Sequence, residues 1–431
     1  MQLMNLIGGE LTGPEDGRWL DNIEPATGLV FSQIPRSNQS DVERAVQAAQ
    51  RAFPAWSSTP LEERAACLRR WGQLIAQHSE KLIASESQDN GKPVSLARSV
   101  DIPRAQKNLE FFAGAIEHFA SESHIPAGAT HIHYTHRKPI GVVGCISPWN
   151  LPLYLFTWKI APALAAGNCV IAKPSEVTPV TAWMLSTWAA EAGFPPGVFN
   201  VIHGLGPEAG QAIVEHPQIK AISFTGGTNT GAHIARTTAG QFKKLSLELG
   251  GKNPALIFAD CNFEEAVKTT VRSSFANQGQ ICLCSSRILI EDAIYDQFRD
   301  ALVAKAQKIE PGDPALSETK WAPCPLKVTA TKSSVTSRRP RNWAPRYCAV
   351  VPRLLLQMSV VRKDISSNRP FWRGWTHSAQ STKKRSLGRS SHCKDLAMRK
   401  KPLPWPMRAI TGWPRRSGHK IYLELTEWLH K

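Results

Sequence analysis

Apolar residues recur at helical spacing in the first part of the chain. In the stretch DVERAVQAAQRAF, which Ser40 and Asp41 open, the apolar side chains lie three or four residues apart. This spacing is typical of one face of an amphipathic helix. Residues 61–86 continue in the same manner. We therefore expect amphipathic surface helices over both stretches.

Short β-type runs alternate with helical patterns from about residue 140. The runs are GVVGCISP, NCVIAKP, VFNVIHG, AISFTGG, KLSLELGG and NPALIFAD, and the helical patterns are WKIAPALAAG, residues 178–193, and stretches from 206 and 229. This alternation predicts βαβ units and a parallel sheet. Because CVIA and AISF are nearly all apolar, their strands should be buried on both faces. The expected fold class is α/β, with a Rossmann-like doubly wound sheet.

The composition and the hydrophobic periodicity of the sequence change after Glu318. Residues 321–431 show no sustained period, are dense in Ser, Arg and Pro, and hold 7 of the 14 tryptophans. Local preferences there do not agree on one fold. Two interpretations remain open: a basic disordered tail, or a stretch that was never selected in this reading frame.

The net charge of +17 is unevenly distributed. Residues 321–431 hold 24 Lys and Arg against 4 Asp and Glu, whereas residues 1–320 hold 28 against 31. A strongly basic balance usually indicates an anionic partner. Since the excess belongs to the tail, we expect no specific nucleic-acid site. An alternative to any enzymatic role is that this polypeptide is a truncated or frameshifted product with impaired catalysis. Its basic tail would then bind polyanions nonspecifically.

Composition is otherwise that of a globular protein, with 42% hydrophobic and 20% charged residues. No basic start followed by an apolar run predicts a signal peptide, and no run of about 20 apolar residues predicts a membrane span. The expectation is a soluble, cytoplasmic protein without a membrane partner. The nine cysteines are an odd number without a CxxC pair, so neither a disulfide framework nor a metal site is favoured.

Cys282 and Cys284 stand one residue apart in NQGQICLCSSR. With disulfide and metal roles disfavoured, each is either a buried, inert thiol or a nucleophile. The residues by themselves do not separate these two interpretations.

A predicted strand ends at Gly226 and Gly227, and residues 228–237 follow as a predicted helix. A helix N-terminus of this kind suits a phosphate group, although a plain tight turn has the same sequence. Lys173 and Glu176 follow another apolar strand, where the pair can hold the hydroxyls of a ribose. The alternative for that pair is a solvated cap of the next helix.

Two further candidates stand at predicted strand ends. Asn150, directly after Trp149, can stabilise an oxyanion with its side-chain amide, or it can be a turn residue. Glu248 precedes Gly250 and Gly251 and can serve as a general base if apolar neighbours surround it. Otherwise it is an exposed acid.

Taken in order, five motifs resemble the aldehyde dehydrogenase superfamily of NAD(P)-dependent enzymes that oxidise aldehydes to carboxylic acids. The motifs are PWNLP, AGNCVIAKPSEVTP, SFTGG with Gly231, LELGGKNP and NQGQICLCSSR, and the resemblance runs from about residue 6 to 320. The variants ICLCSSR, ANQGQ and IPRAQKNLEFFAG look most like the branch that acts on muconic semialdehydes. The cofactor implied is NAD, because Glu176 would repel a 2′-phosphate.

The resemblance implies a role for each matched residue. Cys282 is the nucleophile, and Cys284 becomes a neighbouring packing thiol. Glu248 is the base that activates water for deacylation, and Asn150 forms the oxyanion hole with the backbone N–H of Cys282. The cofactor would contact Trp149, Lys173, Glu176, Gly226, Gly227 and Gly231. Arg104 is where the semialdehyde branch binds a substrate carboxylate.

Domain organisation also follows from the resemblance. It implies an NAD-binding domain over residues 1–247 with an oligomerisation hairpin at 125–141, and the start of a catalytic domain over 248–320. Family members form homo-oligomers through that hairpin and a C-terminal segment. Gly227 departs from the family, which usually has Ser there.

The family motifs expected after residue 320 do not occur in this chain. At the join, SETKWAPC stands where relatives commonly read Glu-Thr-Lys-Met-Gly-Pro. A shift of one base converts the codons for Met-Gly-Pro into Trp-Ala-Pro, so we hypothesise a change of reading frame near Trp321. This hypothesis implies an incomplete catalytic domain and weak activity.

Overall fold

The computed structural model describes residues 1–321 and the strand Ser359–Lys363. All of these lie in one compact unit, Met1–Ser366, while a second unit, Ser367–Lys431, lies outside the described residues. The predictions for the tail at 321–431 therefore fall outside them, except at Trp321 and Ser359–Lys363.

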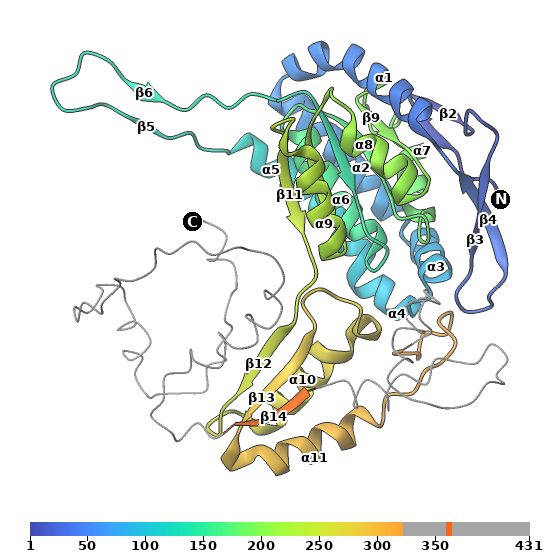
Figure 1. The fold of residues 1–431 in the computed structure, drawn as a ribbon, viewed down its shortest axis with the longest axis vertical. Helices are drawn as coiled ribbons and strands as arrows, with labels where there is room; N and C mark the ends of the chain where they lie inside the picture. The colour runs from blue at the N-terminus through green and yellow to red at the C-terminus, as the bar shows by residue number, and fades with distance from the viewer. Residues whose placement is uncertain (322–358, 364–431) are drawn as a thin grey trace, which may run out of the picture. The chain divides into compact units, whose positions relative to one another are not determined.

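The described residues form helices and strands, which alternate from residue 142 to residue 248 (Figure 1). The helices are α1 (Gln39–Ser58), α2 (Leu61–Gln77), α3 (Ser79–Asn90), α4 (Val94–Leu96), α5 (Ile102–Glu117), α6 (Pro152–Ala165), α7 (Val180–Thr187), α8 (Gln211–Glu215), α9 (Thr228–Ala239), α10 (Phe263–Phe275) and α11 (Tyr295–Ala306). The strands are β1 (Asn5–Ile7), β2 (Glu10–Thr12), β3 (Trp19–Ile23), β4 (Val30–Pro35), β5 (Ser123–His124), β6 (His133–Tyr134), β7 (Val142–Ile146), β8 (Cys169–Lys173), β9 (Phe199–Val201), β10 (Ile219–Thr225), β11 (Lys244–Glu248), β12 (Asn253–Ile257), β13 (Ser285–Glu291) and β14 (Ser359–Lys363).

Seven strands form the largest sheet, in the order β11-β10-β7-β8-β9-β1-β2. The pairs from β11 to β9 are parallel, and β1 and β2 extend the β9 edge in antiparallel register. The chain winds from β7 through β8 to β9, then returns to the other side of β7 with β10 and β11. This reversal is the mark of a doubly wound sheet, so the predicted fold class is confirmed.

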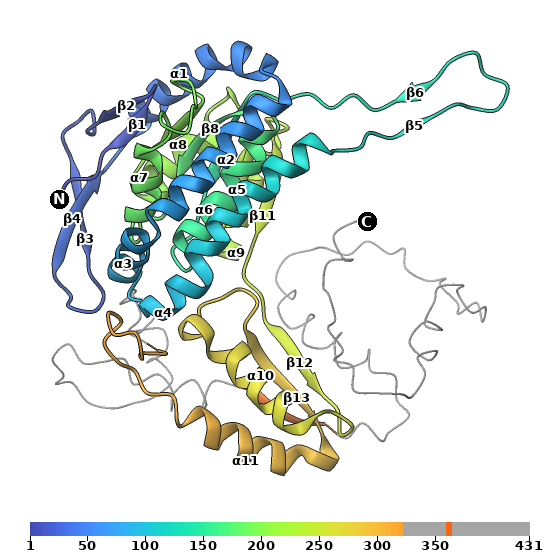
Figure 2. The ribbon, with the colours of Figure 1, turned by 180° about the vertical axis from the view of Figure 1, so that it is seen from behind.

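Helices cover both faces of this sheet. Helix α6 packs on one face with α2 and α5 behind it, whereas α1, α8 and α9 pack on the other (Figures 1 and 2). The strands β7, β8 and β9 are consequently buried almost throughout. Their apolar runs match the burial that the sequence pattern predicts for central parallel strands.

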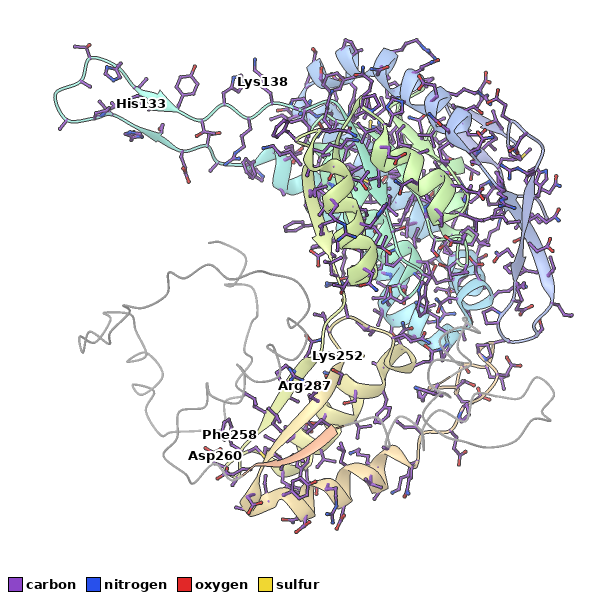
Figure 3. All side chains as sticks on the ribbon, viewed as in Figure 1. His133, Lys138, Lys252, Phe258, Asp260 and Arg287 are labelled. Atoms are coloured by element: carbon purple, nitrogen blue, oxygen red, sulfur yellow. The ribbon has the colours of Figure 1, made fainter. Side chains whose placement is uncertain are left out.

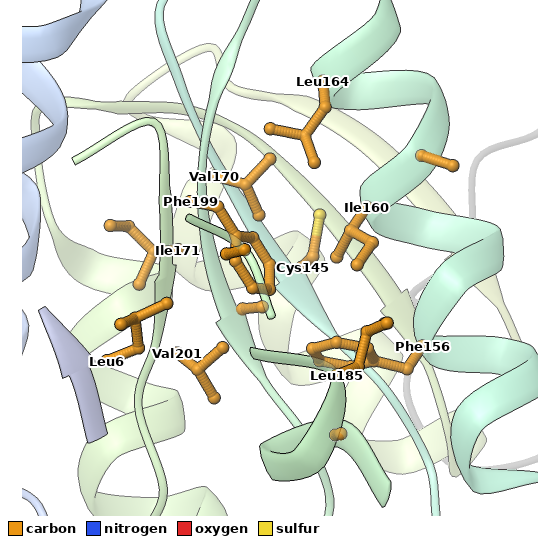
Figure 4. Close-up of a cluster of buried hydrophobic side chains, with 14 of the residues drawn as sticks. Leu6, Cys145, Phe156, Ile160, Leu164, Val170, Ile171, Leu185, Phe199 and Val201 are labelled. Carbon is orange, nitrogen blue, oxygen red and sulfur yellow. The ribbon is translucent and has the colours of Figure 1, made fainter. Parts of the chain in front are cut away.

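The main hydrophobic core lies between the sheet and α6. Phe156 and Ile160 of α6 are buried beside Cys145 of β7, and Val170 and Phe199 continue the same layer (Figure 4). Burial of each large apolar side chain contributes on the order of 2 kcal/mol. Burial also raises the pKa of the Cys145 thiol to about 12, so this cysteine packs as a small apolar residue.

Helix α1 starts slightly earlier than its apolar pattern indicates. It begins at Gln39, and Asn38 rather than Ser40 is the N-cap. The Ser40 N–H donates to the Asn38 side chain (2.8 Å), and the Asn38 N–H donates to Asp41 (3.1 Å). This reciprocal capping box satisfies two backbone donors of the first turn.

A second sheet has the parallel order β12-β13-β14, packed with α10 and α11. Its buried residues form a hydrophobic cluster separate from the first, including Phe275, Ile288 and Phe298. Lys252 and Arg287 lie close together at the start of this sheet (Figure 3), where the Arg287 Nε donates to the Lys252 carbonyl oxygen over 3.0 Å. The division of the chain into domains near residue 248 stays a prediction.

Trp321, at the proposed reading-frame change, is buried and contacts the backbone of α10. Its side chain is 4% exposed, and its indole N–H donates to the Phe275 carbonyl oxygen over 3.0 Å. A buried indole normally needs such a partner. The structure therefore accommodates tryptophan at this position.

The strands β5 and β6 form a short antiparallel hairpin, pairing Ser123 with Tyr134 and His124 with His133. The sequence placed a hairpin within residues 125–141, so its first strand lies just before that range.

Within the described residues, no helix is both long and apolar enough to span a membrane.

Gly144 and Gly114 provide a matched test of the packing. A Cβ on Gly144 of β7 would lie 2.6 Å from Ile213 Cγ2, whereas a Cβ on Gly114 of α5 meets nothing within 4 Å. Gly144→Ala should lower the free energy of unfolding by about 1–3 kcal/mol through overpacking. Gly114→Ala should raise it by about 0.5–1 kcal/mol through helix propensity. Urea denaturation of both variants measures these changes, and equal effects would contradict this packing.

Candidate active site

Several of the predicted site residues follow the carboxyl ends of parallel strands. The winding reverses between β7 and β10, which are neighbours in the sheet. Trp149 and Asn150 follow β7, and Gly226 and Gly227 follow β10. Open α/β sheets bind ligands at such a reversal, because the loops that leave the two strands diverge and open a crevice.

Lys173 and Glu176 lie together at the end of β8. The Lys173 side chain is 2% exposed, and its Nζ donates to Glu176 Oε2 (3.2 Å) and to the Pro174 carbonyl oxygen (3.1 Å). Burial lowers the pKa of Lys173, and the nearby Glu176 carboxylate opposes that shift. The pair offers a donor and an acceptor side by side.

The glycine turn after β10 opens α9, as the sequence predicts. Gly227 is the N-cap of α9 and has an ordinary φ of −71°. A Cβ on Gly226 would lie 2.4 Å from the Phe224 ring, and one on Gly231 would lie 2.4 Å from Leu249 Cδ2. Glycine at 226 and 231 thus permits close packing, and the N-terminal N–H groups of α9 remain a suitable anion site.

Glu248 ends β11 directly beside this turn. Its register partner is Thr225 of β10, and its carbonyl oxygen accepts the Gly226 N–H over 3.0 Å. The side chain is exposed among the described residues. Burial lowers the pKa of Lys159 of α6, and the charge of Glu248 is among the effects that oppose this shift. Lys159 Nζ also donates to Ser223 Oγ over 3.4 Å.

Cys282 and Cys284 lie in the loop between α10 and β13, and they differ in environment. Cys282 is exposed, whereas Cys284 is partly buried and its sulfur contacts the Ala276 carbonyl oxygen at 3.9 Å. Burial raises the pKa of the Cys284 thiol, which keeps it protonated and unreactive. The exposed sulfur is therefore the one that a substrate can reach.

The backbone before Cys282 has an unusual conformation. Asn277 and Gln278 have φ of 49° and 56°, in the left-handed region that side chains other than glycine seldom adopt. Both residues are buried. Such strained conformations persist only where surrounding contacts hold them, and they are frequent at functional sites.

Asn150 joins this loop to the end of β7 through two hydrogen bonds. Its Nδ2 donates to the Gln280 carbonyl oxygen (2.7 Å), while Asn277 Nδ2 donates to the Asn150 carbonyl oxygen (2.9 Å). An amide nitrogen carries two N–H groups. One of them donates to the loop, so the second can serve another acceptor.

Arg104 lies apart from these contacts, on α5, and is exposed. Its guanidinium stacks on the ring of Tyr154 of α6 at 5.3 Å, and one of its N–H groups donates to the Tyr154 hydroxyl over 3.3 Å. No contact among the described residues joins Arg104 to Cys282. Among the same residues, no group of three His, Cys, Asp or Glu could hold a metal ion.

Sequence reasoning missed His203, which lies beyond the end of β9. It is 1% exposed, and its backbone N–H donates to Asn5 Oδ1 over 2.8 Å. Burial lowers its pKa to about 3, and the Lys173 charge adds to this effect. A neutral histidine therefore stands beside the Lys173 ammonium. The sequence carried no signal for it, because a histidine after an apolar strand is equally typical of an exposed turn.

The chain resembles proteins of known class over most of its described length. The model of the aldehyde dehydrogenase family matches residues 12–333. A 2-aminomuconic semialdehyde dehydrogenase of Bos taurus is 50% identical over 315 residues, covering 73% of this chain and 64% of the relative. A 2-hydroxymuconic semialdehyde dehydrogenase of Pseudomonas sp. strain CF600 is 41% identical over 327 residues, covering 75% of this chain and 67% of the relative.

Solved structures agree with this resemblance. The crystal structure of PnpE in complex with nicotinamide adenine dinucleotide is 39% identical, with a TM-score of 0.75 over 77% of this chain and 68% of that one. The chain therefore belongs to the aldehyde dehydrogenase family. It spans about 64% of the length of the bovine relative.

Gly227 and Gly226 test the geometry of the glycine turn that follows β10. A Cβ on Gly227 meets only Thr230 Oγ1, at 4.0 Å, and serine is a preferred N-cap. Gly227→Ser should keep or raise the free energy of unfolding by up to about 0.5 kcal/mol. Gly226→Ser should lower it by about 1–3 kcal/mol, because its Cβ meets the Phe224 ring. Thermal unfolding compares the two, and a larger loss for Gly227→Ser would rule out this turn.

Proposed function

We propose that this polypeptide carries the chemistry of an NAD-dependent aldehyde dehydrogenase, which oxidises an aldehyde to a carboxylic acid through a thioester on Cys282. The observation that supports it most directly is the pair of hydrogen bonds between Asn150 and the loop that carries Cys282. They attach an oxyanion donor at the sheet reversal to the loop of an exposed thiol. A tight turn without function would not need this link.

Each proposed step uses a residue type suited to it. The Cys282 thiolate adds to the aldehyde carbonyl carbon, and the oxygen becomes an alkoxide that Asn150 and the Cys282 backbone N–H stabilise. The thioester that remains after oxidation is hydrolysed by water that Glu248 deprotonates. Cys282 and Glu248 are both exposed among the described residues. Because solvent water competes with the protein donors for hydrogen bonds to the alkoxide, we expect a low rate of aldehyde oxidation.

The residues at the sheet edge fit a dinucleotide. Lys173 and Glu176 would hold the adenosine ribose, the turn at Gly226 and Gly227 would face the pyrophosphate, and Gly231 would allow α9 to pack closely. Trp149 would line the same cleft. When bound, NAD supplies the hydride acceptor. We propose NAD rather than NADP because the Glu176 carboxylate would repel a 2′-phosphate.

We further propose a semialdehyde that carries a carboxylate, of the muconic type. The proposal rests on the names of the two similar dehydrogenases and on the exposed guanidinium of Arg104, held by Tyr154. A guanidinium suits a planar carboxylate because it offers two parallel N–H donors. We also propose that the NAD-binding domain ends near residue 248, where the catalytic domain begins. Subunits would assemble through the β5–β6 hairpin.

The two cysteines separate the nucleophile from its neighbour. Cys282→Ser should abolish NADH formation from a semialdehyde, because a hydroxyl is a far weaker nucleophile than a thiolate. Cys284→Ser should retain the rate within about threefold, since that thiol only packs. Absorbance at the NADH band measures both. A Cys282→Ser variant as active as the parent would refute the mechanism.

Glu176 tests the choice of cofactor. Glu176→Gln removes the negative charge that would repel a 2′-phosphate. The ratio of the Kd for NADP to the Kd for NAD should therefore fall by about tenfold, or about 1.4 kcal/mol. Exposed Glu191 is the control, and Glu191→Gln should leave the ratio unchanged. Isothermal titration with each dinucleotide gives both values. An unchanged ratio in Glu176→Gln would place the ribose elsewhere.

A further inference from the structure

A buried ion pair lies beneath the segment that carries Asn150. Lys92 Nζ contacts Asp101 Oδ1 at 2.6 Å and Glu86 Oε1 at 3.9 Å, and all three side chains are 0% exposed. Replacing such a pair by apolar residues is often neutral or stabilising, because desolvation offsets the attraction. Its presence therefore calls for a purpose beyond stability.

The chain places Lys92 by ending α3 sharply. Gly91 follows the helix with φ of 79°, and its N–H donates to the Ser87 carbonyl oxygen over 2.8 Å. A left-handed residue at this position is a common helix terminus, and glycine adopts it without strain. The turn directs the residues on either side of Gly91, Asn90 and Lys92, to the loop after β7.

Both of these residues hold backbone carbonyl groups of that loop. Asn90 Nδ2 donates to the Trp149 carbonyl oxygen over 2.7 Å, and Lys92 Nζ donates to the Asn150 carbonyl oxygen over 3.3 Å. The second bond is charge-assisted, and its donor, Lys92, is fully buried. Two consecutive peptide groups are thus held by Asn90 and Lys92, and Asn277 donates a further hydrogen bond to the Asn150 carbonyl oxygen.

Glu86 extends the same support to the helix that follows. Its carboxylate accepts the Leu153 N–H (3.4 Å) near the start of α6 and the Thr181 hydroxyl (2.5 Å). Burial raises the pKa of Glu86 to about 8, and the Lys92 charge counteracts part of that rise. The segment from Trp149 to Leu153 is therefore attached at three points to residues 86–92.

We propose that Lys92, anchored by Asp101, is a positioning residue that sets the backbone of Asn150 and so aims its side-chain amide at the oxyanion. This inference rests on the proposed role of Asn150. Lys92 itself touches no reacting atom. Oxyanion stabilisation is sensitive to donor placement, so a shift of about 1 Å in the backbone costs on the order of 10²-fold in rate.

Two reagents distinguish donor placement from thiol reactivity. p-Nitrophenyl acetate acylates a thiolate through a tetrahedral alkoxide: the sulfur adds to the carbonyl carbon, and the alkoxide collapses to the Cys282 thioester and p-nitrophenolate. Iodoacetamide alkylates the same sulfur by direct displacement of iodide, without an oxyanion. Neither reaction needs NAD or turnover. The acylation rate thus reports on the amide, and the alkylation rate reports on access to the thiol.

Lys92→Met should slow acylation of the full chain by about tenfold or more, because the Asn150 carbonyl loses its charged partner. Alkylation by iodoacetamide should change less than twofold. Thr181→Val is the matched control. It removes the hydrogen bond to Oε2 of Glu86, the oxygen that does not contact Lys92 or Leu153, so both rates should stay at the parent values. Stopped-flow absorbance and mass spectrometry of the Cys282 peptide measure them.

Lys92→Met leaves the buried Asp101 carboxylate without its cation and can fail to fold. The double variant Lys92→Met with Asp101→Asn restores neutrality and still lacks the bond to Asn150. A folded double variant that acylates at the parent rate overturns the inference. So does failure of both variants to unfold cooperatively, since Lys92 would then serve the fold itself.

Asn150→Ala separates this inference from the proposed function. If Asn150→Ala slows acylation about 10²-fold but the Lys92 variants do not, only the positioning role is wrong. If Asn150→Ala has no effect, the proposed oxyanion donor is wrong and the inference falls with it. If all of them slow acylation and spare alkylation, both stand.

Discussion

The reversal of winding between β7 and β10 is the constraint on which the site depends. Parallel strands end at one edge, and at a reversal the two following loops leave in different directions. The loop after β7 carries Asn150, and the loop after β10 opens α9 with Gly226 and Gly227. Because β11 pairs with β10, Glu248 ends at the same edge. Sheet topology thus collects residues that are about a hundred positions apart in the chain.

Buried polar contacts then decide how these pieces meet. The loop before Cys282 adopts left-handed backbone at Asn277, and this conformation is held by the exchange of hydrogen bonds with Asn150. The Lys92 ammonium donates to the same Asn150 carbonyl oxygen as Asn277. Each such contact costs free energy if one partner is missing, typically about 1–3 kcal/mol for a buried polar group. The segment is consequently defined more narrowly than apolar packing would define it.

The accuracy of sequence reasoning differed between elements. Apolar runs such as CVIA predicted β8 correctly, since burial on both faces leaves a local signature. The apolar pattern placed the start of α1 one to two residues too late. Asn38 and Ser40 are both good N-cap residues, and only the capping box with Asp41 identifies Asn38 as the N-cap. The tail after Trp321 was predicted to be disordered or out of frame, and apart from Ser359–Lys363 it lies outside the described residues. Those five residues form β14 beside β13, a pairing that the pattern did not indicate.

The sequence by itself determined the alternation of strands and helices, the glycine turn at Gly226 and the motif that contains Cys282. These depend on local spacing and on residue type. Only the tertiary structure decided that Cys282 is exposed while Cys284 is partly buried, and that Lys92 lies in a dry site beneath Asn150. A lysine after a helix is usually solvated, and its burial depends on residues far away in the chain. No local pattern encodes such an environment.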